Sequence, residues 1–149
     1  MEFIIRKCEI NDLPILVELC QKHAAFEQAN YNPNGKQELL QNAIFSNNPK
    51  LFCLIVEINK NIGGFCTYTY DFSTWDAQNF MYMDCLFIEE NFRGYKIGEE
   101  IIENLKQIAE NENCINIQWQ TPVFNERAIK FYNRILGVGK NKVRFVIAL

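Results

Sequence analysis

The sequence predicts an α/β domain built on a mixed, mostly antiparallel central sheet with helices on both faces. Three apolar segments with short connections fill residues 51–88, a pattern typical of neighbouring antiparallel strands. A strand, a glycine-containing turn, a helix and another strand follow each other over residues 80–120, which predicts a right-handed crossover and parallel pairing. Because 48% of the 149 residues are hydrophobic and 22% charged, residues 1–149 are expected to form a single domain with a buried core.

The first part of the chain predicts one strand and two helices. Residues 3–8 (FIIRKC) alternate enough to form a strand. Residues 11–26 (NDLPILVELCQKHAAF) repeat apolar side chains at helical spacing, and Asn11 or Asp12 can cap that helix. Residues 36–45 (KQELLQNAIF) predict a second helix after a loop rich in turn residues.

The rest of the chain alternates between strand and helix patterns. Residues 51–58 are nearly all apolar, which is typical of a strand covered on both faces. Helical spacing returns after the glycine turn and again near the C-terminus, where Gly137 is expected to end the last helix. The predicted elements are strands at 51–58, 62–72 and 80–88, a helix at 99–113, a strand at 114–120, a helix at 125–136 and a strand at 142–149. The predicted order is therefore β-α-α-β-β-β-α-β-α-β.

Charge and composition argue against several classes of function. A net charge of −3, a pI near 5.2 and the lack of a basic cluster argue against nucleic acid as a partner. No apolar run approaches the ~20 residues of a membrane span, and the charged N-terminus is unlike a signal peptide. Because His23 is the single histidine and the six cysteines form no CxxC pair, no metal site is expected. Reduced thiols indicate a cytoplasmic protein.

The stretch ENFRGYKIGEE (89–99) places glycines and basic residues between a predicted strand and a predicted helix. The first N–H groups of a helix have no partner within it, and together with the helix dipole they form an anion site. Gly94 and Gly98 let the backbone approach an anion, and Arg93 and Lys96 add positive charge. The stretch therefore suits a phosphate or pyrophosphate, although an ordinary exposed turn explains the same spacing.

FRGYKIGEEIIENL (92–105) resembles the coenzyme A pyrophosphate loop of the GCN5-related N-acetyltransferases, the GNAT family. That loop has the pattern Arg or Gln, two residues, Gly, one residue, Gly or Ala. Arg93 and Gly98 match its ends, and Lys96 stands at its central glycine. NERAIKFYNRILG (125–137) resembles the family segment N-x-x-A-x-x-F-Y-x-x-x-G, which is more specific than the loop.

Within this family, the chain looks most similar to the diamine (spermidine/spermine) and thialysine acetyltransferases. The stretches that carry this likeness are residues 26–28, 70–88 and 92–109. The resemblance implies a GNAT fold, acetyl-CoA as co-substrate and a homodimer. The residues that it implies for coenzyme binding are Leu86, Phe87, Ile88, Arg93, Gly94, Tyr95, Lys96, Ile97, Gly98, Asn125 and Tyr132.

Acetyl transfer to an amine requires a polarised thioester carbonyl, a deprotonated amine and a proton for the leaving thiolate. The resemblance implies that the strand around Leu86 splays from its neighbour, where a backbone N–H polarises the thioester. It also implies that Tyr132 faces the coenzyme sulfur, where a phenol can protonate the thiolate. On spacing alone, Tyr132 is equally compatible with a core tyrosine beside Phe131, and Asn125 with a simple helix cap.

The same resemblance implies an acidic pocket for the acceptor amine. Asp84 lies just before the splay, where the diamine enzymes have a carboxylate that can bind an ammonium group or relay its proton. Glu27 and Trp75 match further parts of that pocket, and Cys85 replaces a second acidic residue. Two carboxylates and an aromatic face suit a flexible diamine cation. The plain alternatives are a solvated Glu27, a surface-loop Trp75 and a solvent-facing Asp84.

The predicted activity is direct transfer of an acetyl group from acetyl-CoA to the primary amine of a small cationic acceptor, such as a diamine, a polyamine or thialysine. Two alternatives stay open at this point. One keeps the reaction and changes the acceptor to a peptide, a protein or an antibiotic. The other is a non-catalytic sensor that binds acyl-CoA without turnover.

Overall fold

The central sheet is mixed, as the sequence predicts, and its five strands follow the order β1-β2-β3-β4-β5. The computed structural model describes all 149 residues. The first four strands pair antiparallel with their neighbours, whereas β5 pairs in parallel with β4, which confirms the predicted parallel step. The strands are β1 (Phe3–Lys7), β2 (Phe52–Ile58), β3 (Asn61–Ser73), β4 (Gln78–Ile88) and β5 (Ile117–Gln118).

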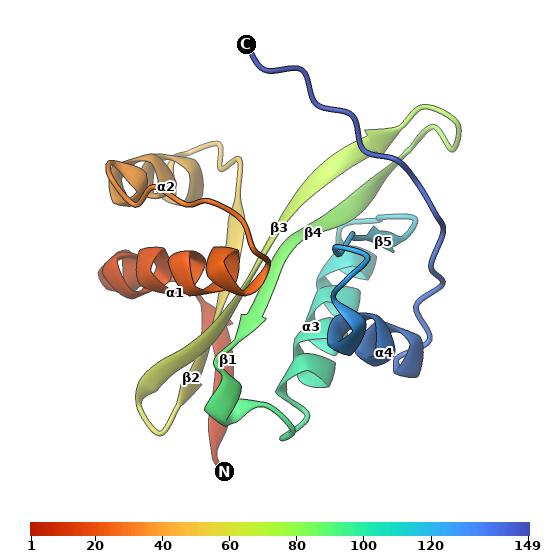
Figure 1. The fold of residues 1–149 in the computed structure, drawn as a ribbon. Helices are drawn as coiled ribbons and strands as arrows, with labels where there is room; N and C mark the ends of the chain where they lie inside the picture. Colours follow the sequence, from red (N-terminus) through yellow and green to blue (C-terminus); the bar gives the residue numbers. More distant parts are fainter.

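Helices cover both faces of the sheet, with α1 and α2 on one side and α3 and α4 on the other (Figure 1). None of them is long and apolar enough to cross a membrane. The helices are α1 (Leu13–Phe26), α2 (Lys36–Phe45), α3 (Ile97–Asn111) and α4 (Glu126–Arg134), with short 3₁₀ turns at Ile10–Asp12 and Glu90–Phe92.

Strand β2 shows why the core has two parts. Successive side chains of a strand point to opposite faces. Ile55 therefore packs on the α1 side, whereas Leu54 and Val56 pack on the α3 side. Fully buried Leu16 and Leu105 face them from α1 and α3. Full burial of such a side chain contributes about 1.5–3 kcal/mol, so the continuous apolar run of β2 reflects cover on both faces.

The start of α1 differs from the prediction in one contact. Asp12 precedes the helix, but its side chain makes no capping hydrogen bond. Its carboxylate instead accepts hydrogen bonds from the two Nη atoms of Arg6 at 2.7 and 3.0 Å. Arg6 Nε also donates to Glu57 at 2.9 Å, so the guanidinium joins β1, β2 and the start of α1. Arg6 lowers the pKa of Asp12, and the stability that this contact adds is lost as the pH falls through that lowered pKa.

The predicted closing strand at 142–149 is wrong. Beyond α4 the chain has no regular secondary structure and leaves the body of the protein as an extended segment (Figure 1). Val143, Phe145 and Ile147 are at least 78% exposed. A strand needs a neighbouring edge to satisfy its N–H and C=O groups. The last strand of the sheet, β5, is paired over only two residues and offers no edge long enough.

The last helix also ends earlier than predicted, at Arg134. Leu136 takes the left-handed conformation, with φ 68°, that the sequence assigns to Gly137. The Gly137 N–H donates to the carbonyl of Tyr132 at 2.9 Å. A Cβ at this glycine would lie 3.0 Å from that carbonyl oxygen and 3.1 Å from the Trp119 ring. Close packing, not the backbone dihedral, therefore requires glycine here.

Candidate active site

The sheet opens along one edge of β4. β4 pairs with β3 as far as Ile88, but with β5 only at Met81 and Tyr82. Residues 83–88 therefore have a free edge, with N–H and C=O groups available to a ligand. The splay that the resemblance implies is present, and it leaves the backbone around Leu86 accessible from this side.

A cavity of about 1350 Å³ lies beside this free edge, between the end of α1, the start of α3 and α4. Pockets for drug-sized ligands occupy about 300–1,000 Å³, so this one has room for a coenzyme and a second substrate. The cavity gathers most of the residues that the sequence singles out. Those that line it are Glu27, Asp84, Leu86, Phe87, Ile88, Arg93, Gly94, Lys96, Ile97, Gly98, Asn125 and Tyr132.

The glycine turn leads into the start of α3, where unpaired N–H groups form the anion site that the sequence predicts. Glu100 makes the first backbone hydrogen bond of the helix, to Lys96, so the N–H groups of residues 97–99 have no partner within it. Gly94 has φ 86° and Lys96 has φ 65°, so lysine occupies a backbone conformation that favours glycine. The Cβ of any other residue at Gly98 would lie 3.0 Å from the Phe131 ring, which shows how closely α3 approaches α4.

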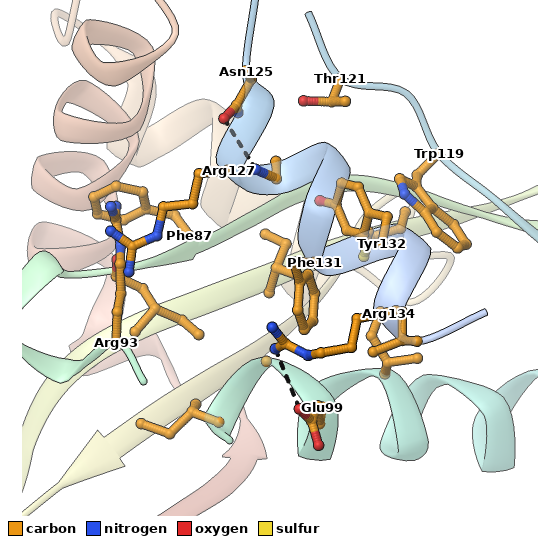
Figure 2. Close-up of a pocket in the computed structure, with 18 of the residues that line it drawn as sticks. Phe87, Arg93, Glu99, Trp119, Thr121, Asn125, Arg127, Phe131, Tyr132 and Arg134 are labelled. Atoms are coloured by element: carbon orange, nitrogen blue, oxygen red, sulfur yellow. Dashed lines mark hydrogen bonds and ion pairs between the residues drawn. The ribbon is translucent and has the colours of Figure 1, made fainter. Parts of the chain in front are cut away.

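Two arginines lie together at this end of the cavity (Figure 2). Arg93 is turned inward: its Nε donates to the Ile88 carbonyl at 2.7 Å, and its guanidinium lies over the Phe26 ring at 4.7 Å. Burial, and then the neighbouring charge of Arg127, lower the pKa of Arg93. The sequence analysis missed Arg127. Its position two residues after Asn125, in the first turn of α4, is the signal that could have found it. A pair of neighbouring guanidiniums favours an anion between them.

Tyr132 is held in the cavity wall by aromatic neighbours. Its ring centroid lies 5.2 Å from that of Trp119 and 5.4 Å from that of Phe131, and Figure 2 shows the three side chains side by side. The hydroxyl makes no hydrogen bond within the chain. Burial, reinforced by the charge of Glu27 among others, raises the pKa of Tyr132, so the phenol is protonated at neutral pH. It can therefore donate a proton.

Asn125 acts as the N-cap of α4. Its side-chain oxygen accepts a hydrogen bond from Ala128 N at 3.3 Å, drawn in Figure 2, and the residue also lines the cavity. The helix cap that the sequence allows is therefore present. Capping leaves the amide nitrogen of the side chain free for another partner.

A β-bulge presents Asp84 to the cavity. Thr67 pairs with Cys85 and Tyr68 pairs with Met83, so Asp84 is the extra residue on β4. The Asp84 carboxylate is exposed to solvent, which explains how the strand tolerates a charged side chain. It forms no ion pair with a lysine or arginine. A bulge re-aims a side chain, and here it turns the carboxylate toward the same space as Glu27.

Glu27, at the end of α1, is the second carboxylate of this region. Its titratable neighbour is His23, whose Nε2 lies 3.5 Å from Glu27 Oε1. His23 lines the same cavity but was considered in the sequence only as a metal ligand. The i, i+4 spacing of the two residues on one helix could have found it. No group of histidine, cysteine and acidic side chains in the chain is suited to a metal ion.

Two of the residues singled out in the sequence lie elsewhere. Trp75 is fully exposed in the turn between β3 and β4, and it does not line the cavity. Tyr95 is 52% exposed on the outside of the glycine turn. Within one chain, the structure does not bring Trp75 to the carboxylates or Tyr95 to the cavity lining.

Comparison with known proteins agrees with this geometry. The model of the acetyltransferase (GNAT) family matches residues 16–138. The chain is 26% identical over 141 residues to the thialysine N-epsilon-acetyltransferase of Mus musculus, a match that covers 89% of this chain and 82% of the mouse protein. It is 28% identical over 138 residues to the spermidine/spermine N(1)-acetyltransferase-like protein 1 of Homo sapiens, covering 87% of this chain and 20% of the human protein.

The fold also has solved counterparts. An aminoglycoside N-acetyltransferase in complex with CoA is similar with a TM-score of 0.82 at 14% identity, over 99% of this chain and 95% of that one. At this identity the likeness shows a shared fold alone. The family match, in contrast, spans most of the chain and includes the free β4 edge, the glycine turn and α4. The chain therefore belongs to the GNAT acetyltransferase family and is an N-acetyltransferase.

Proposed function

We propose that the chain transfers the acetyl group of acetyl-CoA directly to a primary amine of a small cationic acceptor, such as a diamine, a polyamine or a thialysine-like molecule. One observation carries the choice of acceptor. Glu27 and Asp84 line the same cavity as Tyr132, and neither forms an ion pair with a lysine or arginine of the chain. A cationic acceptor would supply the missing partner charge.

The cavity also offers a set of groups that match the coenzyme. The free N–H groups at the start of α3, with Lys96 and Arg127 on the cavity wall, suit its phosphates. The free edge of β4 at Leu86 and Ile88 offers backbone groups to its amide-containing arm. When bound, acetyl-CoA would supply the activated acetyl group, and an N–H near Leu86 would polarise its carbonyl.

Tyr132 would protonate the leaving thiolate. The amine nitrogen would attack the carbonyl carbon of the thioester: a C–N bond forms, the nitrogen loses a proton to solvent and the C–S bond breaks. The thiolate then takes the phenolic proton of Tyr132, which regains a proton from solvent. Burial raises the pKa of Tyr132, so the phenol carries its proton at neutral pH and is available to the thiolate as a hydrogen-bond and proton donor.

The cysteines support direct transfer in a reducing compartment. Burial raises the pKa of Cys85 to about 12, so this residue beside Asp84 is a thiol, not a nucleophilic thiolate, at neutral pH. An acyl-enzyme at Cys85 is therefore disfavoured. All six cysteines are free, which supports our proposal of a cytoplasmic location.

We also propose that two copies form a homodimer. Trp75 and Phe72 are 100% and 58% exposed near the tip of the β3–β4 hairpin, and Phe145 of the C-terminal segment is 88% exposed. A second copy could cover these apolar side chains. Sedimentation equilibrium at micromolar concentration should give twice the 17.5 kDa chain mass. The mass of a single chain would contradict the dimer.

Release of free thiol from acetyl-CoA tests the proposed function across a panel of acceptors. Diamines, polyamines and thialysine should be acetylated with a kcat/KM at least about ten-fold above that of a monoamine of the same length whose other end is uncharged. This ratio corresponds to the free energy of one charge-assisted hydrogen bond. A reaction without acceptor controls for hydrolysis. Turnover confined to peptides or aminoglycosides would overturn the proposed acceptor and keep the reaction. Coenzyme binding without turnover on any amine would overturn the catalytic proposal.

A further inference from the structure

His23 is a titratable side chain of the cavity to which the proposed mechanism gives no task. Its ring stacks on Phe87, with centroids 5.4 Å apart and planes at 29°, and meets the edge of Phe65 at 6.2 Å. The side chain is 14% exposed and lines the cavity. Two aromatic rings therefore fix the imidazole while leaving part of it open to a ligand.

The groups that face His23 come from three elements. Glu27 follows it on α1, Asp84 lies on β4, and Arg93 lies in the glycine turn. Burial lowers the pKa of His23 more than the two carboxylates raise it, and Arg93 lowers it further. At neutral pH the imidazole is therefore neutral and able to accept a proton.

The reaction needs such a base. A primary amine has an ordinary pKa near 10, so the acceptor arrives as an ammonium ion that must lose a proton before it attacks. Tyr132 cannot take that proton, because its phenol is already protonated. Imidazole is the side chain whose ordinary pKa lies nearest neutral pH, which is where a general base works best.

We propose that His23 is the general base that deprotonates the acceptor ammonium, with Glu27 binding the same ammonium beside it. This role rests on the proposed acetyl transfer to an amine. This role requires the proton of neutral His23 to be on Nδ1, which leaves a lone pair on Nε2, 3.5 Å from Glu27 Oε1. Two acceptors at this separation can bind two hydrogens of one ammonium group. The charge of Glu27 also raises the pKa of Tyr132, so the base and the acid lie at the same end of the cavity.

The proton balance needs no reactant besides water. An N–H bond of the ammonium breaks, and its proton forms an N–H bond on His23. The free amine attacks the thioester, and its nitrogen loses a second proton to solvent while Tyr132 protonates the leaving thiolate. The imidazolium formed next to Glu27 and Asp84 is stabilised by both carboxylates until it returns its proton to solvent. The acid limb of kcat/KM should therefore follow the titration of His23, with activity lost as the pH falls through its lowered pKa.

The test compares the pH profile of kcat/KM for a diamine in the wild type and in His23→Gln, with Gln21→Ala on the exposed side of α1 as matched control. His23→Gln should lose about 100-fold at pH 7, with unchanged Kd for acetyl-CoA. Its rate should rise with pH toward the amine pKa near 10 instead of levelling off. Because the chain has one histidine, NMR of that residue gives its pKa directly, which should match the wild-type acid limb.

A second variant separates chemistry from packing. His23→Ala opens space beside Phe87, and added imidazole should restore part of its activity, which a purely structural histidine would not allow. An active wild type whose pH profile survives His23→Gln unchanged would overturn the base and leave the proposed function standing. Loss of rate with the acid limb retained, or no rescue by imidazole, would also overturn it. A wild type that acetylates no amine would overturn the proposed function, and the base with it.

Discussion

The two ends of the cavity are built in different ways. The coenzyme end is built mainly from backbone, to which Lys96 and Arg127 add charge: a free strand edge, the N–H groups at the start of α3 and the close approach at Gly98. The acceptor end consists of side chains, with His23 and Glu27 on α1 and Asp84 on the β4 bulge. A backbone site can be shared by every enzyme that uses one coenzyme, whereas a side-chain site can change with the acceptor.

Tyr132→Phe should give the largest effect, because Tyr132 lies where the two ends meet. Loss of the phenolic proton should lower kcat by about 100-fold, the lower range for a general acid, with the Kd for acetyl-CoA unchanged. The measurement is steady-state kinetics with separate titration of the coenzyme. Tyr82→Phe, a tyrosine of β4 outside the cavity lining, is the matched control. An unchanged kcat would remove Tyr132 from the proton path.

Gly98→Val should damage the coenzyme end alone. The added Cβ would meet Phe131 at 3.0 Å and displace the start of α3 from α4. We expect the Kd for acetyl-CoA, measured by calorimetry, to rise about ten-fold, which corresponds to ~1.4 kcal/mol. Gly139→Ala controls for the substitution itself, since nothing lies within 4 Å of its added Cβ. Equal coenzyme affinity in the two variants would contradict a backbone-built site.

The smallest effect is expected at Lys96, whose φ of 65° is unfavourable for lysine. Lys96→Gly and Lys96→Ala both remove the ammonium group, but only glycine removes the backbone strain. Lys96→Gly should therefore be the more stable of the two by about 1 kcal/mol in urea unfolding. If both variants bind acetyl-CoA equally and less tightly than the wild type, the ammonium contacts phosphate. Affinity equal to wild type would exclude that contact.

Most of the fold could be predicted because its elements follow from local periodicity. Strands β3 and β4 and helix α3 begin and end within two residues of their predicted ranges. The closing strand could not be predicted correctly, since residues 142–149 have a strand-like composition but pair with no strand of the sheet. The capping of α1 failed for a similar reason: Asp12 is bound by Arg6, which comes from another element.

The residues of the site show the same difference between features set by local sequence and features set by contacts between elements. Gly94, Lys96 and Gly98 could be located in the sequence because the backbone geometry of a helix start imposes a spacing. Arg127 and His23 have only a weak signal in the sequence, their spacing from Asn125 and Glu27, because their roles depend on neighbours from other elements, Arg93 and Phe87. The bulge at Asp84 is a property of strand pairing and leaves no mark in the local sequence.

The carboxylates of the acceptor end are expected to select a cationic amine. This is best tested by the ratio of kcat/KM for a diamine to that for a monoamine of equal length, in the wild type and in Glu27→Gln/Asp84→Asn. We expect a ratio of about ten or more in the wild type and near one in the double variant, with the KM for acetyl-CoA unchanged in both. A ratio that survives loss of both charges would show that the two carboxylates do not select the acceptor.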